Sequence, residues 1–351
     1  MISRRSFSRA LPVLAAGALL PTTATAQPAP LTRIAFGSCA DQDRPQPIWD
    51  AILAYRPELF IFAGDNVYGD FRTPDAAALK RAYDKAATLD GPRRLRASVP
   101  HIAIWDDHDY GQNDGGAGFA HKALSKELFL DFWKVPADDV RRRREGLYDA
   151  YVYGPAGMRV QVILLDTRWF RSPLRPTDQR DAPGKERYLP DPDPAKTMLG
   201  PDQWTWLAGE LRKPAELRLL VSTVQILAEG HGWERWGNFP LERQKLFDTI
   251  RESGATGVVL LSGDRHIGAL YRETPAGLYP LTEMTSSGLN KTYPFSREAG
   301  PNRLGPLYGA ANFGVVDIDW WARNLTLALR DESGTVRRSA TIPFEDLRIA
   351  K

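Results

Sequence analysis

Cysteine is nearly absent from this sequence. Among its 351 residues, Cys39 is the single cysteine, so an intramolecular disulfide is excluded. An exposed lone thiol is open to oxidation and exchange in an oxidising compartment. We therefore expect Cys39 to be buried and inert, or else bound to something.

Long apolar segments are also missing. After the N-terminal region, no stretch approaches the roughly 18 consecutive apolar residues that a transmembrane helix needs. No amphipathic or polybasic helix marks a surface that would dock on lipid. We expect a mature protein that is soluble and has no stable association with a membrane.

The N-terminus has the three parts of an export signal. An arginine pair at positions 4 and 5 precedes an apolar run from Ala10 to Leu20, and the small residues Ala24-Thr25-Ala26 follow. Paired arginines are typical of twin-arginine signals. An anchor helix is the alternative, but the apolar run is short and contains Pro12. The sequence predicts a signal peptide at residues 1–26, passage through the twin-arginine translocase and a periplasmic or secreted location.

Beyond that signal, the chain has no excess of positive or negative charge. The whole sequence has 46 Lys and Arg and 43 Asp and Glu, and residues 1–26 contain three arginines and no acid. The remaining chain is therefore balanced, which gives no support to nucleic acid as a main partner. We interpret the basic run Arg141–Arg144 as a solvated loop, with steering of an anionic substrate as the alternative.

Short apolar runs alternate with segments of helical periodicity, which predicts a layered α/β domain. We expect one domain over residues 27–351. Predicted buried strands are Arg33–Gly37, Leu59–Ala63, His101–Trp105, Val160–Leu165, Leu217–Thr223 and Val258–Ser262. Predicted helices are Pro47–Ala54, Asp75–Ala87, His121–Trp133, Asp202–Glu210 and Leu241–Glu252. Strands alone follow from about residue 278, which implies a second sheet, at Leu278–Glu283, Phe313–Ile318, Leu325–Arg330 and Arg337–Ile342.

Four predicted strands end in the same way, with polar side chains directly after the apolar run. Strand ends of an open α/β sheet converge on one crevice, where binding sites form. A cluster of Asp, His, Tyr and Cys in such a place is costly unless a cation neutralises it, so we expect a metal site. The four ends are Gly37-Ser38-Cys39, Gly64-Asp65-Asn66-Val67-Tyr68, Trp105-Asp106-Asp107-His108-Asp109 and Ser262-Gly263-Asp264-Arg265-His266.

These motifs carry a family resemblance. In their residues and order they resemble the alkaline phosphatase D family of the calcineurin-like metallophosphoesterases, of which the cysteine after the first strand is a particular mark. The resemblance extends from Arg33 to about Ile342. It implies a four-layer α/β/β/α sandwich of two mixed sheets flanked by helices, and an exported hydrolase of phosphoric esters. Weaker matches are Asp166-Thr167-Arg168, Gly232-Trp233-Glu234 and Thr285-Ser286-Ser287-Gly288.

The resemblance also implies which residues hold metals. It places Cys39, Asp65, Tyr68 and His266 on a ferric ion, with Asp65 bridging to a second ion. The second ion would be bound by Asp65, Asp107 and Asp264, and oxygen donors favour Ca²⁺ over a soft metal. Other metal pairs stay open. Gln225 follows a strand where relatives place a further ligand, and its assignment also stays open.

The implied chemistry is hydrolysis without a protein nucleophile. The metals bind a water or hydroxide, lower its pKa and polarise the phosphoryl oxygens for attack on phosphorus. His108 is expected to donate a proton or a hydrogen bond to the leaving oxygen, with Asp65 and Asp107 as the other catalytic residues. The alternative is that His108 has a structural role and forms a hydrogen bond to Asp65 or Asp107.

Other residues of the motifs are candidates for substrate contact. We expect Asn66 and Asn113 to donate to phosphate and Arg168 to clamp it. Asp106 and Asp109 are expected to orient the ligand between them, and Arg265 to pack or form a salt bridge. Loop aromatics are candidates for binding an organic leaving group, with ordinary packing as the alternative; they are Trp233, Trp236, Phe239, Tyr293 and Phe295.

Three functions remain compatible with these residues. The first is hydrolysis of small phosphate esters, as monoesters, diesters or both. The second is a phosphodiesterase of the phospholipase D type. The third is a protein without catalysis, in which the metals staple two sheets together; a structural site is closed by protein ligands, whereas a catalytic site keeps an open position. The sequence leaves the natural substrate and the oligomeric state open.

Overall fold

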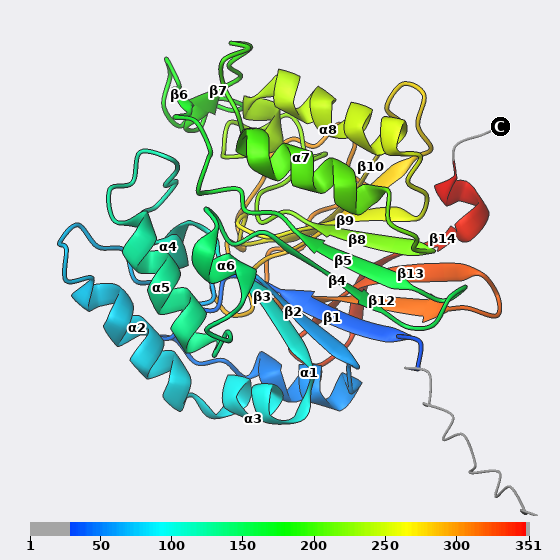
Figure 1. Cartoon of the computed structure of the whole chain (residues 1–351), viewed down its shortest axis with the longest axis horizontal. Coiled ribbons are helices and arrows are strands. Elements are labelled where there is room, and N and C mark those ends of the chain that lie inside the picture. The colour runs from blue at the N-terminus through cyan, green and yellow to red at the C-terminus, as the bar shows by residue number, and fades with distance from the viewer. Residues whose placement is uncertain (1–28, 349–351) are drawn as a thin grey trace, which may run out of the picture.

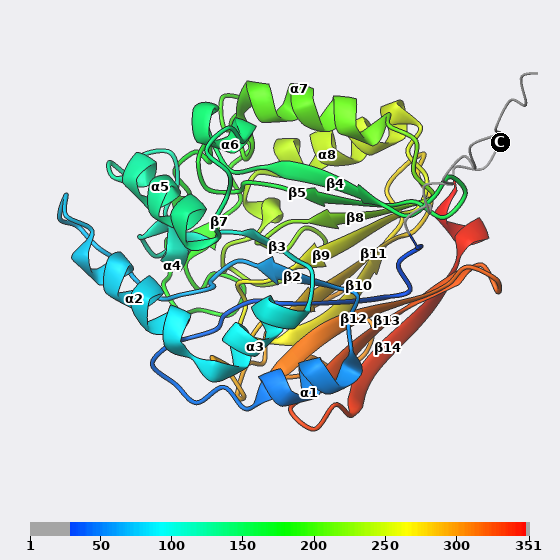
Figure 2. The ribbon, with the colours of Figure 1, turned by 60° about the horizontal axis from the view of Figure 1, so that its bottom comes forward.

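Two six-stranded sheets form the centre of the molecule (Figure 1), in a computed structural model that describes residues 29–348. The predicted signal peptide lies outside these residues. Within them, no helix is both long and apolar enough to cross a membrane. The layered α/β fold predicted from the sequence is confirmed, with two mixed sheets between layers of helices (Figure 2).

The first sheet joins the two ends of the described chain. Its order is β14-β13-β12-β1-β2-β3, where β1 to β3 are parallel and the remaining pairs antiparallel. The last three strands therefore extend this sheet beside β1, and the expectation that they belong to the second sheet is wrong; of the four strands predicted after residue 278, only the one at Leu278–Glu283 lies in the second sheet, as β11. The strands are β1 Arg33–Gly37, β2 Leu59–Ala63, β3 His101–Ile104, β12 Asn312–Asp319, β13 Asn324–Asp331 and β14 Val336–Pro343.

The second sheet is built from the middle of the chain. Its order is β10-β11-β9-β8-β5-β4; β5, β8, β9 and β11 are parallel, and β4 and β10 are antiparallel edges. Neither edge strand is predicted from the sequence, because the apolar and aromatic runs Ala150–Tyr153 and Ala269–Tyr271 are short. The strands are β4 Asp149–Tyr153, β5 Val160–Leu164, β8 Leu217–Val221, β9 Val258–Ser262, β10 Gly268–Glu273 and β11 Leu281–Ser286.

Helices cover the outer face of each sheet (Figures 1 and 2). The first sheet is flanked by α1 Ile48–Tyr55, α2 Ala77–Thr88, α3 Asp90–Ser98 and α5 Lys122–Phe132. The second is covered by α7 Gly200–Leu211 and α8 Pro240–Ser253. The shorter elements are α4 Asp107–Tyr110, α6 Val140–Arg143, the 3-10 turns η1 Trp236–Asn238 and η2 Phe344–Leu347, and the small hairpin β6 Arg175–Pro176 with β7 Tyr188–Leu189.

The two sheets are joined at the edge where their parallel strands end. An isolated bridge links Ser38, after β1, to Ser287, after β11. The backbone N–H groups of Gly288 and Leu289 donate to the carbonyl oxygen of Ser38, at 3.1 Å and 3.0 Å. The polar segments that follow the strands of both sheets therefore meet at one place.

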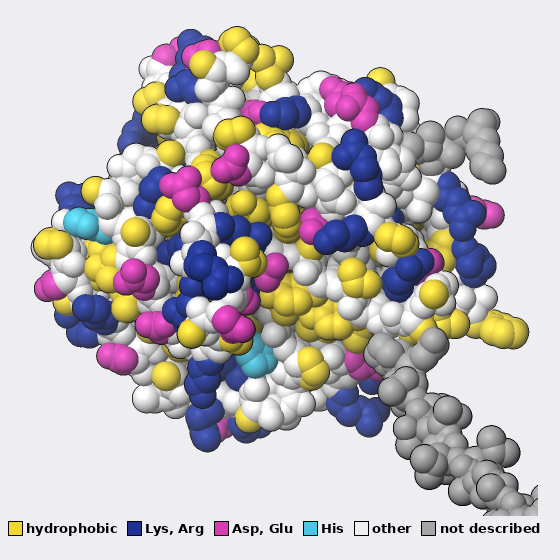
Figure 3. Space-filling model, viewed as in Figure 1, with side chains coloured by type: hydrophobic (Ala, Val, Ile, Leu, Met, Phe, Trp, Pro, Cys, Tyr) yellow, Lys and Arg dark blue, Asp and Glu magenta, His cyan; other side chains and the backbone are white. Residues whose placement is uncertain are grey.

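The basic run Arg141–Arg144 forms α6 and the residue after it. Arg141 is buried and paired with Asp139 at 2.8 Å, while Arg142 pairs with Asp131 at 2.9 Å. The guanidinium of Arg144 lies over the ring of Tyr148, 3.9 Å from its centroid. These side chains have local partners, and acidic and basic groups are interspersed over the face shown in Figure 3. The run is therefore a local structural element rather than a separate basic patch.

Candidate metal centre

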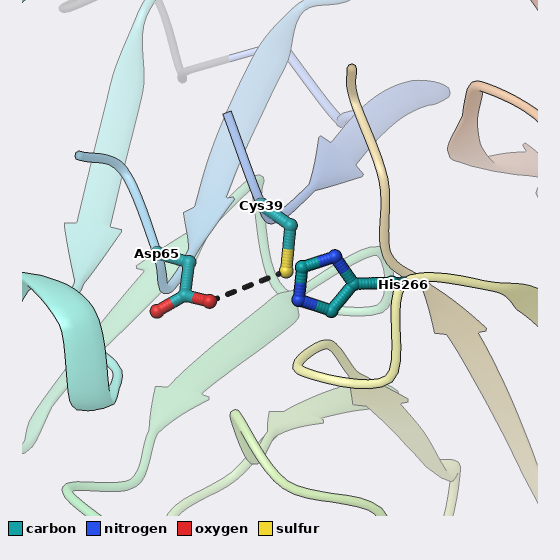
Figure 4. Close-up of side chains that lie close together, drawn as sticks. All are labelled: Cys39, Asp65 and His266. Carbon is teal, nitrogen blue, oxygen red and sulfur yellow. Dashed lines mark hydrogen bonds between the residues drawn. The ribbon is translucent and has the colours of Figure 1, made fainter. Parts of the chain in front are cut away.

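Cys39, Asp65 and His266 point toward one another at the joined edge of the sheets (Figure 4). All three are buried, and each offers a ligand atom within 4.8 Å of the others. The Oδ2 atom of Asp65 lies 3.4 Å from Cys39 Sγ and accepts a hydrogen bond from the Tyr68 hydroxyl at 3.0 Å. The structure thus brings together the four residues that the resemblance places on one ion.

A second group of oxygen donors adjoins the first. Asp65, Asp107 and His108 form one compact set, and Asp106, Asp107 and Asp264 form another, again within 4.8 Å. Within residues 29–348, the buried Asp106 Oδ2 and Asp107 Oδ1 atoms have no hydrogen-bond partner. A buried carboxylate oxygen without a partner is costly, and a hard cation with oxygen ligands would satisfy it. The donors therefore fit cations bound side by side, with Asp65 common to the first group and its neighbour and Asp107 common to the remaining two.

Backbone strain is concentrated at these strand ends. Of the ten non-glycine residues with positive φ in the described chain, four are proposed ligands: Cys39 at 61°, Asp65 at 49°, Asp264 at 64° and His266 at 57°. The left-handed region is unfavourable for side chains with a Cβ atom and persists where the surrounding structure imposes it, often at functional sites. These turns direct the side chains of successive strand ends into one cluster.

Ser287 connects the two sides of the first group. Its hydroxyl lies 3.0 Å from Cys39 Sγ and accepts a hydrogen bond from the backbone N–H of His266 at 2.6 Å. The Nδ1 atom of His266 is 2.8 Å from the carbonyl oxygen of Lys291. That contact leaves Nε2 for a metal. Sequence reasoning noted Ser287 only as part of a weaker motif and did not consider Lys291.

Without a bound cation, burial and mutual repulsion favour the protonated forms of the acidic groups in this cluster. Burial, followed by the charge of Asp107, raises the pKa of Asp65 well above its usual value. Burial, followed by the charge of Asp65, likewise raises the pKa of the Cys39 thiol and of the Tyr68 hydroxyl. Burial lowers the pKa of His266 to about 3, so its ring is neutral. A cation would replace the protons of the acids and be bound by the neutral imidazole.

His108 is held by an acid that sequence reasoning missed. Its Nδ1 atom lies 2.5 Å from Asp70 Oδ2, and its backbone N–H donates to Asp65 Oδ1 at 3.2 Å. Burial disfavours the charged ring, but Asp107, Asp65 and Asp70 together raise the pKa of His108 to about 10. The ring is therefore protonated at neutral pH when no cation is bound. Asp70 follows Tyr68 by two residues and carries no motif of its own.

Two of the three predicted substrate contacts are wrong. Both amide protons of Asn66 are used inside the protein, by the carbonyl oxygen of Ile104 at 2.9 Å and by Asp109 Oδ2 at 2.6 Å. Arg168 is completely buried; its Nε atom donates to Asp106 Oδ1 at 2.5 Å and its Nη1 atom to Glu234 Oε2 at 2.7 Å. Both side chains therefore orient acidic residues instead of reaching a substrate.

Asp106 and Asp109 are both held by contacts inside the protein, and Asp106 also belongs to one of the candidate ligand groups. Asp106 also accepts from the Thr223 hydroxyl at 2.7 Å, and Asp109 accepts from the backbone N–H of Asp106 at 2.5 Å. Arg265 pairs with Glu298 in a buried salt bridge, as its place between two proposed ligands predicted. These contacts fix the acidic segment between β3 and α4.

Gln225 lies outside the two groups of donors. Its amide nitrogen donates to the Thr285 hydroxyl at 2.9 Å and to the Tyr271 hydroxyl at 3.2 Å, and its oxygen lies 3.1 Å from Nε2 of the buried His231. All polar atoms of the amide are thus engaged by neighbouring side chains. Gln225 therefore stabilises the second sheet through these contacts.

A hollow of about 480 Å³ opens over the metal centre. Asp107, His108, Asp264 and His266 form one wall, and Asn113 lies at its edge. Loop residues also line the hollow, namely Arg187, Tyr188, Trp233, Lys291 and Tyr293. Of the candidate aromatics, Trp233 and Tyr293 therefore reach the site, whereas Trp236 and Phe239 are buried in the core and Phe295 is 87% exposed.

Comparisons with known proteins agree with this arrangement. A family model described as PhoD-like phosphatase matches residues 34–299. Alkaline phosphatase D of Bacillus subtilis (strain 168) is 24% identical over 252 residues, which cover 62% of this chain and 40% of that protein. This chain thus spans about two fifths of the length of that curated relative.

Solved structures support the fold. A structure of PhoD superposes with a TM-score of 0.67 at 16% identity, covering 90% of this chain and 69% of that chain. Purple acid phosphatase PPD1 from yellow lupin (Lupinus luteus) seeds superposes with a TM-score of 0.59 at 12% identity, covering 91% of this chain and 55% of the other. At these identities the likeness concerns the fold alone, and it bears out the two-sheet metallophosphoesterase architecture.

Proposed function

The chain belongs to the PhoD-like phosphatase family, and from that premise we propose that it is a metal-dependent hydrolase of phosphoric esters, with monoesters, diesters or both as substrates. One observation supports this most strongly. The proposed ligands from four strand ends lie in three overlapping groups, linked through Asp65 and Asp107, and the hollow is lined by Asp107, Asp264 and His266.

The residues present fit two cations. Cys39, Asp65, Tyr68 and His266 would hold one, and Asp65, Asp107 and Asp264 the other. Bound cations of this kind lower the pKa of a water and polarise phosphoryl oxygens. The thiolate, phenolate and imidazole of the first set are the donors for which we propose iron, and the carboxylates of the second set are those for which we propose calcium.

The protein's own groups supply orientation and a proton. Asp70 fixes the ring of His108 beside Asp107, where it is able to donate to a leaving oxygen. Lys291 carries a cation over the Tyr68 ring, 3.3 Å from the centroid, in the same hollow. Its closest acidic group is Asp41, at 3.6 Å. Lys291 and Asn113 are therefore the groups that we propose for contact with phosphoryl oxygens.

The open hollow favours catalysis over a purely structural metal site. A metal staple is closed by protein ligands, whereas Asp107, Asp264 and His266 all face the 480 Å³ hollow. Export by the twin-arginine route is part of the same proposal. It is supported by the arginine pair and the apolar run of residues 1–26.

The proposed function is tested by hydrolysis of matched aryl esters. Purified protein should hydrolyse p-nitrophenyl phosphate, bis-p-nitrophenyl phosphate or both, and a chelator should abolish the activity. Replacement of His108 by Ala should lower kcat by about 100-fold or more, the usual contribution of a positioned proton donor, while metal content stays unchanged. Release of choline from phosphatidylcholine, measured in parallel, would identify a phospholipase D type of activity instead. No hydrolysis of any ester by metal-loaded protein would contradict the proposal.

A further inference from the structure

Tyr293 occupies a fixed position beside the proposed ligand His266. The two rings are stacked, with centroids 4.4 Å apart and an interplanar angle of 14°. The backbone N–H of Tyr293 donates to the carbonyl oxygen of His266 at 2.9 Å. The imidazole in turn contacts the carbonyl oxygen of Lys291, two residues before Tyr293. The aromatic ring is therefore held in place before any substrate binds.

One face of that ring is left for a ligand. His266 covers one face, yet Tyr293 remains 46% exposed and lines the hollow together with Asp107 and Asp264. An aromatic side chain that is held in place, half exposed and open to the hollow offers apolar contact area and a polar hydroxyl to a ligand. Its free face borders the space that the organic part of a substrate would fill.

Two other aromatic side chains, Tyr188 and Trp233, line the hollow. Tyr188 is held by its hydroxyl, which donates to Asp114 Oδ2 at 2.7 Å. The guanidinium groups of Arg187 and Arg265 lie over the indole of Trp233, 4.8 Å and 4.9 Å from the ring centroid. Arg265 is itself fixed by its buried salt bridge to Glu298. Two cations already stack on Trp233, and Tyr188 is bound to Asp114. Tyr293, which is 46% exposed, is therefore the ring that we consider for a new partner.

The volume of the hollow agrees with a ligand larger than phosphate. At about 480 Å³ it falls within the roughly 300–1,000 Å³ range of sites that enclose small organic molecules. The proposed cations would hold the phosphoryl group, and Tyr293, stacked beside the proposed ligand His266, would lie next to the organic group.

We propose that Tyr293 is a specificity-determining residue that stacks on a flat ring in the organic part of the substrate, so that the site prefers phosphate esters bearing such a ring, nucleotides being the class we infer. This rests on the proposed function. Stacking of a base on an aromatic side chain contributes about 1–3 kcal/mol, which corresponds to a change in Kd of roughly fivefold to 100-fold.

The test compares two ligands that share one ester bond. Adenosine 5′-monophosphate and methyl riboside 5-phosphate have the same ribose C5–oxygen–phosphorus linkage, and only the first has a base. Kd by calorimetry and kcat/KM are measured for both, on metal-loaded wild type, Tyr293→Ala and Tyr293→Phe. Phe295→Ala is the matched control, because Phe295 lies in the same loop, is 87% exposed and does not line the hollow.

Wild type should bind the nucleotide at least fivefold more tightly than the riboside. Tyr293→Ala should remove that preference through a weaker nucleotide Kd, with the riboside values and the metal content unchanged. Tyr293→Phe and Phe295→Ala should keep the preference. Equal losses for both ligands in Tyr293→Ala, which a mere support of His266 would produce, would overturn the proposal, as would a wild type without preference. If neither these monoesters nor bis-p-nitrophenyl phosphate is hydrolysed, the proposed function fails, while the Kd ratio still decides the role of Tyr293.

Discussion

The contact between Asp70 and His108 shows how single residues set the chemistry of the site. His108 lies in a motif, but its orientation depends on a carboxylate from the loop after β2, 2.5 Å from Nδ1. Such a contact fixes the ring and leaves Nε2 as the donor. Asp70 itself is accessible, with 42% of its side chain exposed. Water therefore weakens the pair, and Asp70 acts as a positioning residue.

Replacement of Asp70 by Asn should lower kcat about tenfold, the lower end of the range for residues that orient catalytic or metal-binding groups. KM and metal content should change little, because the metal donors and the hollow are untouched. Steady-state kinetics together with elemental analysis check this. Asp84→Asn, an exposed acid on α2, serves as the control and should behave as wild type. An unchanged kcat in Asp70→Asn would show that His108 does not depend on this contact.

Some residues of the site could be predicted from the sequence, and others could not. Asp65, Asp107 and Asp264 are recognisable because each follows a buried strand, whereas Ser287 and Asp70 act through contacts that only the folded chain reveals. For Arg168, the sequence motif suggested a role that the folded chain does not support. An arginine in a motif near a phosphate site suggests a clamp, but its partners Asp106 and Glu234 are as buried as it is, and burial of unpaired acids would be costly.

At the scale of elements, strands with two buried faces were the easiest to predict. The predicted bounds of β1, β2 and β9 agree with the structure, since every residue of β2 and β9 and all but the first residue of β1 are buried. The edge strand β4 is only partly buried, and its short run Ala150–Tyr153 was not recognised as a strand. Strand partners were harder still, because pairing of β12 with β1 joins segments almost 300 residues apart and no local pattern records it.

The close approach of β2 and β3 at their ends gives an element-scale prediction. Gly64 has φ of 97°, and a Cβ atom there would lie 2.5 Å from Asp106 Cβ. Gly64→Ala should therefore reduce the free energy of unfolding by about 1–3 kcal/mol and displace the acidic segment. Gly118→Ala is the matched control, because a Cβ atom there meets nothing within 4 Å. Urea unfolding measures both, and equal stability of the two variants would show that the strand ends are not tightly packed.

The whole molecule is expected to lose stability in mild acid through His231. Burial, reinforced by Arg265, lowers the pKa of this histidine well below 6.5, so the folded state binds fewer protons than the unfolded state. The contribution of neutral His231 to the free energy of unfolding is complete above pH 6.5. It decreases as the pH falls below that value, by up to about 1.4 kcal/mol per pH unit.

The prediction is checked by the free energy of unfolding of wild type and His231→Gln between pH 7.5 and 5.5. Wild type should lose about 1 kcal/mol more than the variant over this interval. Equal pH dependence of the two proteins would mean that His231 is not held neutral by the fold. Because both proteins keep the same proposed ligands, acid release of metal would affect them alike.

The organisation of the whole molecule depends on the meeting of two sheets at Asp65. Strand ends of the first sheet supply Cys39 and Asp65, those of the second supply Asp264 and His266, and Ser287 bonds across the join. We therefore expect metal binding and the fold to be linked, with metal removal lowering the melting temperature of wild type as the acids regain their mutual repulsion.

We propose that two cations sharing Asp65 make this chain an ester hydrolase. Metal content and hydrolysis, measured on the same samples of wild type and Asp65→Asn, test this proposal. Wild type should carry two metal equivalents per chain and hydrolyse a phosphate ester. Asp65→Asn should lose at least one equivalent and nearly all turnover, while Asp84→Asn retains both. If Asp65→Asn keeps two equivalents and full turnover, or wild type remains active after both metals are removed, the account is contradicted.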